Sequence, residues 1–370
     1  MIYEWIFWGL VILSLIEFIS FYRNIKIKNK HIIDSLILLL FIVFAGGRIC
    51  GLDYSSYERY FNESQIGILG IVNNISEPGF ILLCKILPTY RILLFTVATI
   101  SVVCSYSSFR KEKCTGIIFM LSLFFATYFL FYNMGVMRQG IAISICLYSL
   151  RYIESKDKRF FLLLLVALSF HVSSICFLPM YFVGNKKFSK KIYYTILIAS
   201  LFVSLSGFFF GDVINFFVSK FGGEFLKHKF LVNSSIYSKD SIISLLRRIV
   251  FSVFFIEAFT RRTFRLGNMC FSRREETENT WMYINGYVLS TILFTMFGAI
   301  GLGGFGGRGT ASLYCMFWFL YDQIIYDKKN RNLGLLYFIV FVMLTYESFH
   351  STLYQTVGNT YIPYKFFLQR

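Results

Sequence analysis

Apolar residues occur along the chain in long runs separated by short polar segments, and this pattern predicts membrane-spanning helices. A helix needs about 20 largely apolar residues to cross the hydrocarbon core of a bilayer. Ten runs approach this length, near residues 2–22, 32–47, 91–109, 114–133, 138–153, 192–210, 241–260, 281–300, 310–327 and 334–349. We therefore predict an all-α polytopic membrane protein, a helical bundle of about 10–12 transmembrane helices with additional re-entrant or interfacial helices.

Basic residues concentrate in six of the connecting segments, and these segments set the orientation. They lie at 23–30, 110–113, 151–159, 186–191, 261–274 and 328–331. Because loops rich in Lys and Arg stay in the cytoplasm, we predict that all six are cytoplasmic. Both termini then lie on the opposite face, together with an interfacial segment at 48–90 and a loop at 211–240. We found no linker of composition typical of a domain boundary, so we expect residues 1–370 to form a single integral membrane domain.

Two features conflict with simple crossings. Residues 160–183 lie between two basic clusters, yet as a helix they span only about 36 Å, which is one crossing. We therefore expect a re-entrant hairpin of two half-helices that meet at His171, buried in protein or lining a wet cavity. Arg247 and Arg248 fall inside an apolar run, where a charge is costly, so we expect them to reach the interface or to find partners.

Composition supports a membrane protein and changes how the charge is interpreted. Hydrophobic residues make up 56% of the chain and charged residues only 15%, with a mean hydropathy of +0.61, which excludes a soluble globule. The net charge of +17 follows the loops, so we expect membrane lipids and no nucleic acid as partners. The first run lacks a preceding basic region and a cleavage site, so we expect a retained helix.

Several familiar chemistries lack their sequence motifs. The eight cysteines form neither a CxxC pair nor a Cys/His spacing suited to zinc, so we expect no disulfide framework and no metal site. The outer segments lack an Asp-x-Asp pair for a metal-bound nucleotide sugar, and the chain lacks a P-loop, Gly-x-Ser-x-Gly and His-Glu-x-x-His. We expect no cofactor.

Polar residues on the predicted outer face form the first candidate site. The stretch 48–61 predicts an interfacial amphipathic helix, in which Asp53 and Tyr57 share a face. Its tyrosines would also suit the headgroup level of a purely structural surface helix. Glu77 precedes Pro78 and a short apolar stretch, so it is either a helix-start carboxylate or part of a site.

Two arginines and a histidine complete the candidate set. Arg138 opens the fifth run at the outer boundary, where it either reaches for headgroups or binds phosphate through its guanidinium. Arg308 lies in the glycine-rich run 303–309, whose backbone N–H groups are expected to approach an anion closely. His171 lies in an apolar context, where desolvation favours its neutral, proton-accepting form. His350 is a weaker candidate. These groups suit an anionic, lipid-borne substrate.

Taken together, these residues resemble the EpsG-like branch of the Wzy, or O-antigen, polysaccharide polymerases. The matching motifs are Gly51-Leu-Asp-Tyr-Ser-Ser-Tyr57, Glu77-Pro-Gly-Phe80, Arg138-Gln-Gly-Ile-Ala142, Phe170-His-Val-Ser-Ser174 with Leu178-Pro-Met-Tyr-Phe182, and Tyr361-Ile-Pro-Tyr-Lys365. The resemblance covers nearly the whole chain. It implies a GT-C-like, metal-independent glycosyltransferase of the bacterial cytoplasmic (inner) membrane that joins oligosaccharide repeat units carried on undecaprenyl diphosphate at the outer face.

The resemblance also implies roles and partners. Donor and acceptor would both be undecaprenyl-diphosphate-linked oligosaccharides, and a flippase and a chain-length regulator would act beside the enzyme. Arg138, Arg308 and Arg48 would stabilise the departing diphosphate, since preplaced cations supply much of such catalysis. The acceptor hydroxyl needs a base, for which His171 is preferred to Asp53 and Glu77. Tyr54, Tyr57 and Gln139 would bind sugar.

Two other classes remain open. An O-antigen ligase or a membrane acyltransferase would also place His and Arg in a helical bundle, although a ligase is expected to carry a larger outer loop. A flippase or exporter of lipid-linked oligosaccharides would use the same arginines without chemistry. The reaction products of purified lipid-linked repeat units distinguish the three classes.

Overall fold

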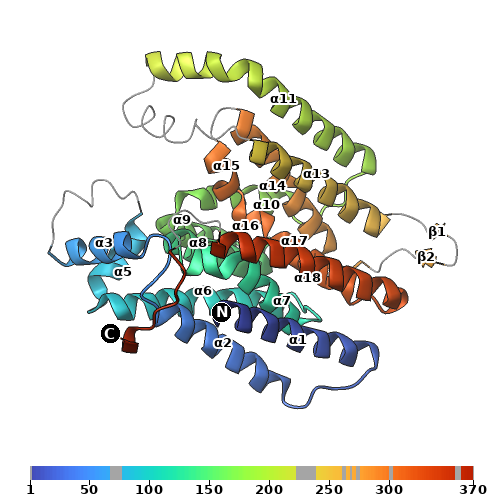
Figure 1. Ribbon diagram of the computed structural model, residues 1–370. Coiled ribbons are helices and arrows are strands. Elements are labelled where there is room, and N and C mark those ends of the chain that lie inside the picture. Colours follow the sequence, from blue (N-terminus) through green and yellow to red (C-terminus); the bar gives the residue numbers. More distant parts are fainter. Residues whose placement is uncertain are drawn as a thin grey trace. The chain divides into compact units, whose positions relative to one another are not determined.

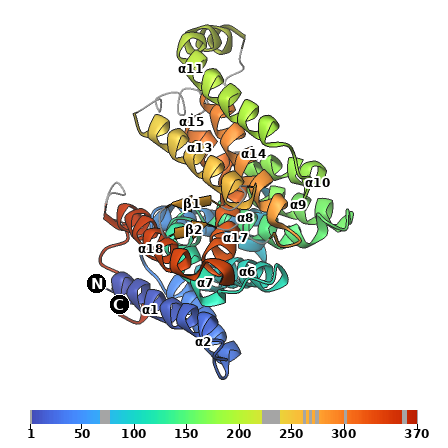
Figure 2. The same cartoon turned by 90° about the vertical axis from the view of Figure 1, so that its right-hand side faces the viewer.

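The computed structural model describes residues 2–66, 77–221, 239–260, 264–266, 269–271, 276–299, 303–354 and 360–369. These residues are almost entirely helical, which confirms the predicted fold class. The exception is a small antiparallel hairpin of β1 (Phe264–Leu266) and β2 (Met269–Phe271). The chain divides into two compact units, one of residues 1–174 with 321–370 and one of residues 175–320 (Figures 1 and 2).

Helices cover all ten predicted spans. The first unit contains α1 (Ile2–Tyr22), α2 (Lys30–Gly46), α3 (Tyr54–Ile66), α5 (Pro78–Ile86), α6 (Tyr90–Lys111), α7 (Ile117–Phe124), η1 (Phe125–Asn133), α8 (Met137–Ser149), η2 (Leu150–Tyr152), α9 (Arg159–Phe170), η4 (Lys328–Asn330), α18 (Arg331–Tyr354) and η5 (Phe367–Gln369). The second contains α10 (Pro179–Val183), α11 (Lys190–Phe221), α13 (Lys239–Thr260), α14 (Thr280–Ala299), α15 (Gly303–Gly309) and α16 (Ala311–Tyr314). The helices η3 (Val172–Phe177) and α17 (Met316–Ile325) cross the boundary between the units.

Among the described residues, four helices are long and apolar enough to cross a membrane. They are Ile2–Tyr22, Tyr90–Lys111, Thr280–Ala299 and Lys328–Tyr354. In α1 the buried residues recur every three or four positions, whereas Trp5, Ile12 and Ile16 are exposed. A helix that exposes large apolar side chains on one face suits a lipid environment. The chain is therefore a membrane protein, and the count of 10–12 spans stays a prediction.

The helix formed by α7 and η1 is the centre of the first unit. Every residue of α7 is buried, which agrees with an apolar run that has no polar face. α1 packs against α7, and α18 packs against η1. This central helix ends at Asn133, directly before α8 begins, so it determines where the first residues of α8 lie.

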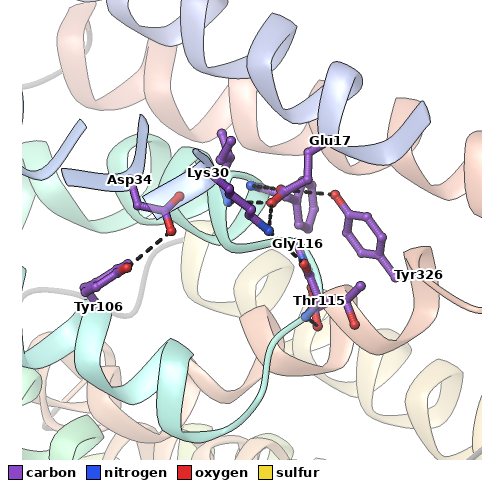
Figure 3. A network of polar contacts seen from close by, with 10 residues as sticks. Glu17, Lys30, Asp34, Tyr106, Thr115, Gly116 and Tyr326 are labelled. Atoms are coloured by element: carbon purple, nitrogen blue, oxygen red, sulfur yellow. Dashed lines mark hydrogen bonds and ion pairs between the residues drawn. The ribbon is translucent and has the colours of Figure 1, made fainter. Parts of the chain in front are cut away.

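Two carboxylates from other helices pair with N–H groups at the start of α7, and Figure 3 shows one of them, that of Glu17. Residue 116 is a glycine, and a Cβ there would collide with the ring of Tyr326. The Asp322 carboxylate instead accepts the N–H groups of Thr115 (2.9 Å) and Gly116 (2.7 Å). Glu17 accepts those of Ile118 (3.3 Å) and Phe119 (3.0 Å). Side chains from two other helices thus satisfy four of the N–H groups around the start of α7, where a helix has no backbone partners of its own for them.

Contacts in the first unit join the basic segment 23–30 to the chain near residue 115 and to the segment 328–331. Lys30 forms an ion pair with Glu17 (2.6 Å) and donates to the carbonyl of Thr115 (3.4 Å), and Lys328 donates to Asn24 (3.0 Å). The two chain termini also lie on one side, because the Tyr3 hydroxyl donates to the carbonyl of Tyr361 (2.9 Å). These contacts agree with the predicted arrangement, in which the basic loops lie at one end and the two termini at the other. Which end faces the cytoplasm stays a prediction.

In the second unit, α14 packs against α10, α11, α13, α15 and α16. Arg248 of α13 is buried, donates to the Ser290 hydroxyl (3.0 Å) and lies over the rings of Phe294 and Tyr314. The expectation that Arg248 finds partners is confirmed. α11 continues to Phe221, so the first part of the expected loop 211–240 is helical, and residues 222–238 lie outside the described residues.

Candidate functional site

A cluster of charged and aromatic side chains forms in the first unit where four helices begin or end. α3 packs against α5, α5 packs against α9, and α9 packs against α8. Glu77 immediately precedes α5, Arg138 is in the first turn of α8, and His171 immediately follows α9. The structure therefore brings together three residues from three separate sequence motifs.

Glu77 does not act as the cap of its own helix. Pro78 occupies the first position of α5, and the Glu77 side chain makes no capping hydrogen bond. Its carboxylate instead pairs with the Arg138 guanidinium, with 2.5 Å between Oε2 and Nη1. Only 5% of Glu77 is exposed. The structure thus decides against the helix-start role and in favour of a tertiary ion pair.

Arg138 is held by aromatic rings as well as by Glu77. Its guanidinium lies over the rings of Tyr57 (5.7 Å) and Tyr60 (5.9 Å) in α3, which contributes cation–π attraction. Among the described residues, its Nε is buried without a hydrogen-bond partner, while 24% of the side chain is exposed. An arginine fixed in this way has donor capacity left for an anion.

His171 lies where α9 breaks. α9 has 12 residues, about 18 Å, which is shorter than the roughly 30 Å hydrocarbon core. His171 itself is extended, with φ −159° and ψ 126°, and η3 follows at Val172. The predicted break at His171 is confirmed. Its Nε2 lies 3.8 Å from Glu77 Oε1.

The other side of the imidazole contacts Ser173. The Ser173 hydroxyl lies 2.6 Å from Nδ1, and the Ser173 backbone N–H donates to the same nitrogen at 3.2 Å. Gln139 in turn donates from Nε2 to the Ser173 hydroxyl at 3.4 Å. Gln139 and Ser173 are both buried. Ser173 therefore fixes the imidazole through Nδ1, while Nε2 lies on the side of the Glu77 carboxylate.

This cluster combines one carboxylate, one guanidinium and one imidazole in a partly desolvated place. Tyr57 is buried beneath Arg138; burial raises the pKa of its phenol, and the guanidinium opposes that rise. The arrangement supplies a donor for a phosphate oxygen and a proton acceptor for a hydroxyl, the two groups that acid–base chemistry on a phosphate-activated substrate needs.

Four residues that were expected to act on the substrate differ in their exposure. Asp53 is exposed, immediately before α3. Arg48 is 1% exposed, donates to the Ala45 carbonyl (2.5 Å) and pairs through its backbone with Phe366. The expected diphosphate role of Arg48 does not fit this structure, because protein encloses the guanidinium. Tyr54 and Tyr57 are 8% and 1% exposed, so the expected sugar stacking does not fit these two rings.

Gln139 and Arg308 also differ from expectation. Gln139 is fully buried and is directed at Ser173, so the structure gives it a supporting position. The glycine-rich run folds as the short helix α15 rather than as an open loop, and its expected approach to an anion stays a prediction. Arg308 is exposed and belongs to the second unit; its role stays a prediction.

Sequence reasoning missed Ser173 and Tyr60. A serine two residues after a histidine is within reach of the imidazole Nδ1 through both its hydroxyl and its amide, and this spacing was the available signal. Tyr60 is three residues after Tyr57, so the two share a helical face, and that face is where Arg138 lies.

Comparison with known proteins gives one family. The model of the EpsG family matches residues 31–366, which includes Glu77, Arg138, His171 and Ser173. No curated protein and no solved structure matches the chain.

Proposed function

The chain belongs to the EpsG family, a Wzy-like polymerase family, and from this membership and the site we propose a specific reaction for its general polysaccharide-polymerase-like role. The protein is a metal-independent glycosyltransferase that joins oligosaccharide repeat units carried on undecaprenyl diphosphate. It acts in the bacterial cytoplasmic membrane, with the Glu77 cluster facing outward. A flippase supplies its substrates and a chain-length regulator acts beside it.

One observation carries the proposal. Arg138 is paired with Glu77 at 2.5 Å, yet 24% of its side chain remains exposed. Glu77 and two tyrosine rings fix the guanidinium before a substrate arrives, so binding a diphosphate costs little further ordering of this side chain. The carboxylate beside it is positioned to act on a hydroxyl while the arginine binds the leaving group.

The chemistry of glycosyl transfer requires both functions. The bond between the anomeric carbon and the diphosphate oxygen breaks, and its electron pair stays on the diphosphate, where Arg138 stabilises the charge. The acceptor hydroxyl oxygen bonds to that carbon and loses its proton to a base. Glu77 and His171 face each other at 3.8 Å and are the groups nearest to this role, whereas exposed Asp53 lies at the start of α3.

Reconstitution with purified lipid-linked repeat units tests the reaction. A polymerase produces a ladder of chain lengths. A single addition would assign the protein to the ligases or acyltransferases, and translocation without a new bond would assign it to the flippases. Glu77→Gln should remove the ladder, while the matched control Glu58→Gln, on the neighbouring helix α3, should retain it.

A further inference from the structure

The two donors of Ser173 determine which imidazole nitrogen carries the proton. A backbone N–H can only donate, so the 3.2 Å contact from Ser173 N makes His171 Nδ1 an acceptor. The Ser173 hydroxyl lies 2.6 Å from the same nitrogen and accepts from Gln139, which leaves its own hydrogen for Nδ1. Neutral His171 must then carry its proton on Nε2.

The Nε2 nitrogen that carries this proton lies near a carboxylate. Nε2 lies 3.8 Å from Glu77 Oε1, and only 7% of the Glu77 side chain is exposed. Hydrogen bonds run in one direction, from the Gln139 amide through the Ser173 hydroxyl to the imidazole Nδ1, and the Glu77 carboxylate lies beyond the opposite nitrogen. With its proton on Nε2, neutral His171 presents no lone pair to an acceptor hydroxyl on that side.

We propose that Ser173, supported by Gln139, is a positioning residue that holds neutral His171 as its Nε2–H tautomer, so that Glu77 accepts the proton in the reaction and His171 only orients it. This inference rests on the proposed glycosyl transfer. The hydroxyl proton passes to a Glu77 oxygen as the hydroxyl oxygen bonds to the anomeric carbon, and the diphosphate leaves with the electron pair of the broken bond. Glu77 then returns its proton to water.

The tautomer can be measured without any activity. The wild-type protein, with isotope-labelled histidine in lipid bilayers, gives imidazole ¹⁵N and ¹³C shifts that distinguish the two neutral tautomers. The chain contains only four histidines, so the spectrum of a His171→Gln sample identifies the His171 signals by their absence. We expect Nε2–H for neutral His171. An Nδ1–H tautomer would overturn the inference.

Variants of Ser173 connect the tautomer to turnover. Ser173→Ala removes the closer donor and keeps the amide, so we expect a measurable Nδ1–H population and a kcat lower by roughly tenfold, with KM little changed. Ser173→Thr restores the hydroxyl and should restore both. Ser174→Ala is the control, because Ser174 is equally buried at 3%. Wild-type tautomer and kcat in Ser173→Ala would contradict the proposal.

The two candidate bases are separated by their amide variants. The side-chain N–H of glutamine can replace the Nε2–H donor, so His171→Gln should retain part of the activity, whereas Glu77→Gln should retain none. The reverse result would make His171 the base. If wild-type protein forms no polymer while the Nε2–H tautomer is observed, the proposed function fails and the assigned tautomer stands.

Discussion

Glu17 offers the sharpest test of how the first unit is stabilised. It is 3% exposed and its carboxylate accepts two N–H groups at the start of α7, pairs with Lys30 at 2.6 Å and accepts from the Tyr326 hydroxyl at 3.4 Å (Figure 3). Glu17→Ala removes all four contacts at once and leaves a small void. Glu17→Gln keeps the shape and one acceptor oxygen.

The expected loss of stability follows from the polar groups that stay buried after Glu17 is removed. Each backbone N–H left unsatisfied costs about 1–3 kcal/mol, and removing one partner of a buried ion pair costs about 3–5 kcal/mol. Lys30 is 30% exposed and can regain water, so these terms do not add in full. We expect Glu17→Ala to destabilise the unit by about 3–5 kcal/mol and Glu17→Gln by roughly half as much.

Thermal unfolding in detergent measures this difference. A loss of 1 kcal/mol lowers Tm by about 2–4 °C in a folded unit of the size of the first one, so Glu17→Ala should lower it by roughly 6–20 °C. Glu4→Ala is the control, because Glu4 is in the same helix and, in the part of the chain that the structure describes, makes only an exposed contact with Tyr354; it should change stability by less than about 0.5 kcal/mol. Hydrogen exchange should rise at the N–H groups of Ile118 and Phe119. Equal melting of Glu17→Ala and Glu4→Ala would refute the capping argument.

Three further predictions address the other cap, the anion site and the topology. Asp322→Ala should lower Tm, because it leaves the N–H groups of Thr115 and Gly116 without their acceptor, and Asp322→Asn should lower it less. Equal Tm values for the two variants would count against capping through this carboxylate. Arg138→Lys should keep the fold but lose most polymer in the reconstituted assay, because an ammonium lacks the guanidinium fork, whereas Arg59→Lys, at an exposed position of α3, should not; full polymer yield in both would exclude a bidentate anion contact. Lys186→Cys, introduced into a variant without the native cysteines, should be labelled only in permeabilised cells, and labelling in intact cells would move the loop outside.

Much of the fold can be predicted from short segments of the sequence. The apolar runs, the basic clusters and the break at His171 could be predicted because span length and loop charge are properties of short segments. The presence of two compact units could not, since it depends on which helices pack together. The extension of α11 to Phe221 was also missed, because polar residues within 211–221 resemble a loop when the packing partner is unknown.

The same distinction between sequence and tertiary structure holds for the candidate site. The sequence by itself determined the residue types, since Glu77, Arg138 and His171 stand out as charged or titratable groups beside apolar runs. Only the tertiary structure decided that these three meet, that Arg48 and Tyr57 are enclosed, and that Ser173 holds the imidazole. The physical reason is that a contact such as the one between Glu77 and Arg138 joins the starts of two helices far apart in the chain. Their separation in space depends on how α5, α8 and α9 pack, and on the central helix whose capping carboxylates come from α1 and α17.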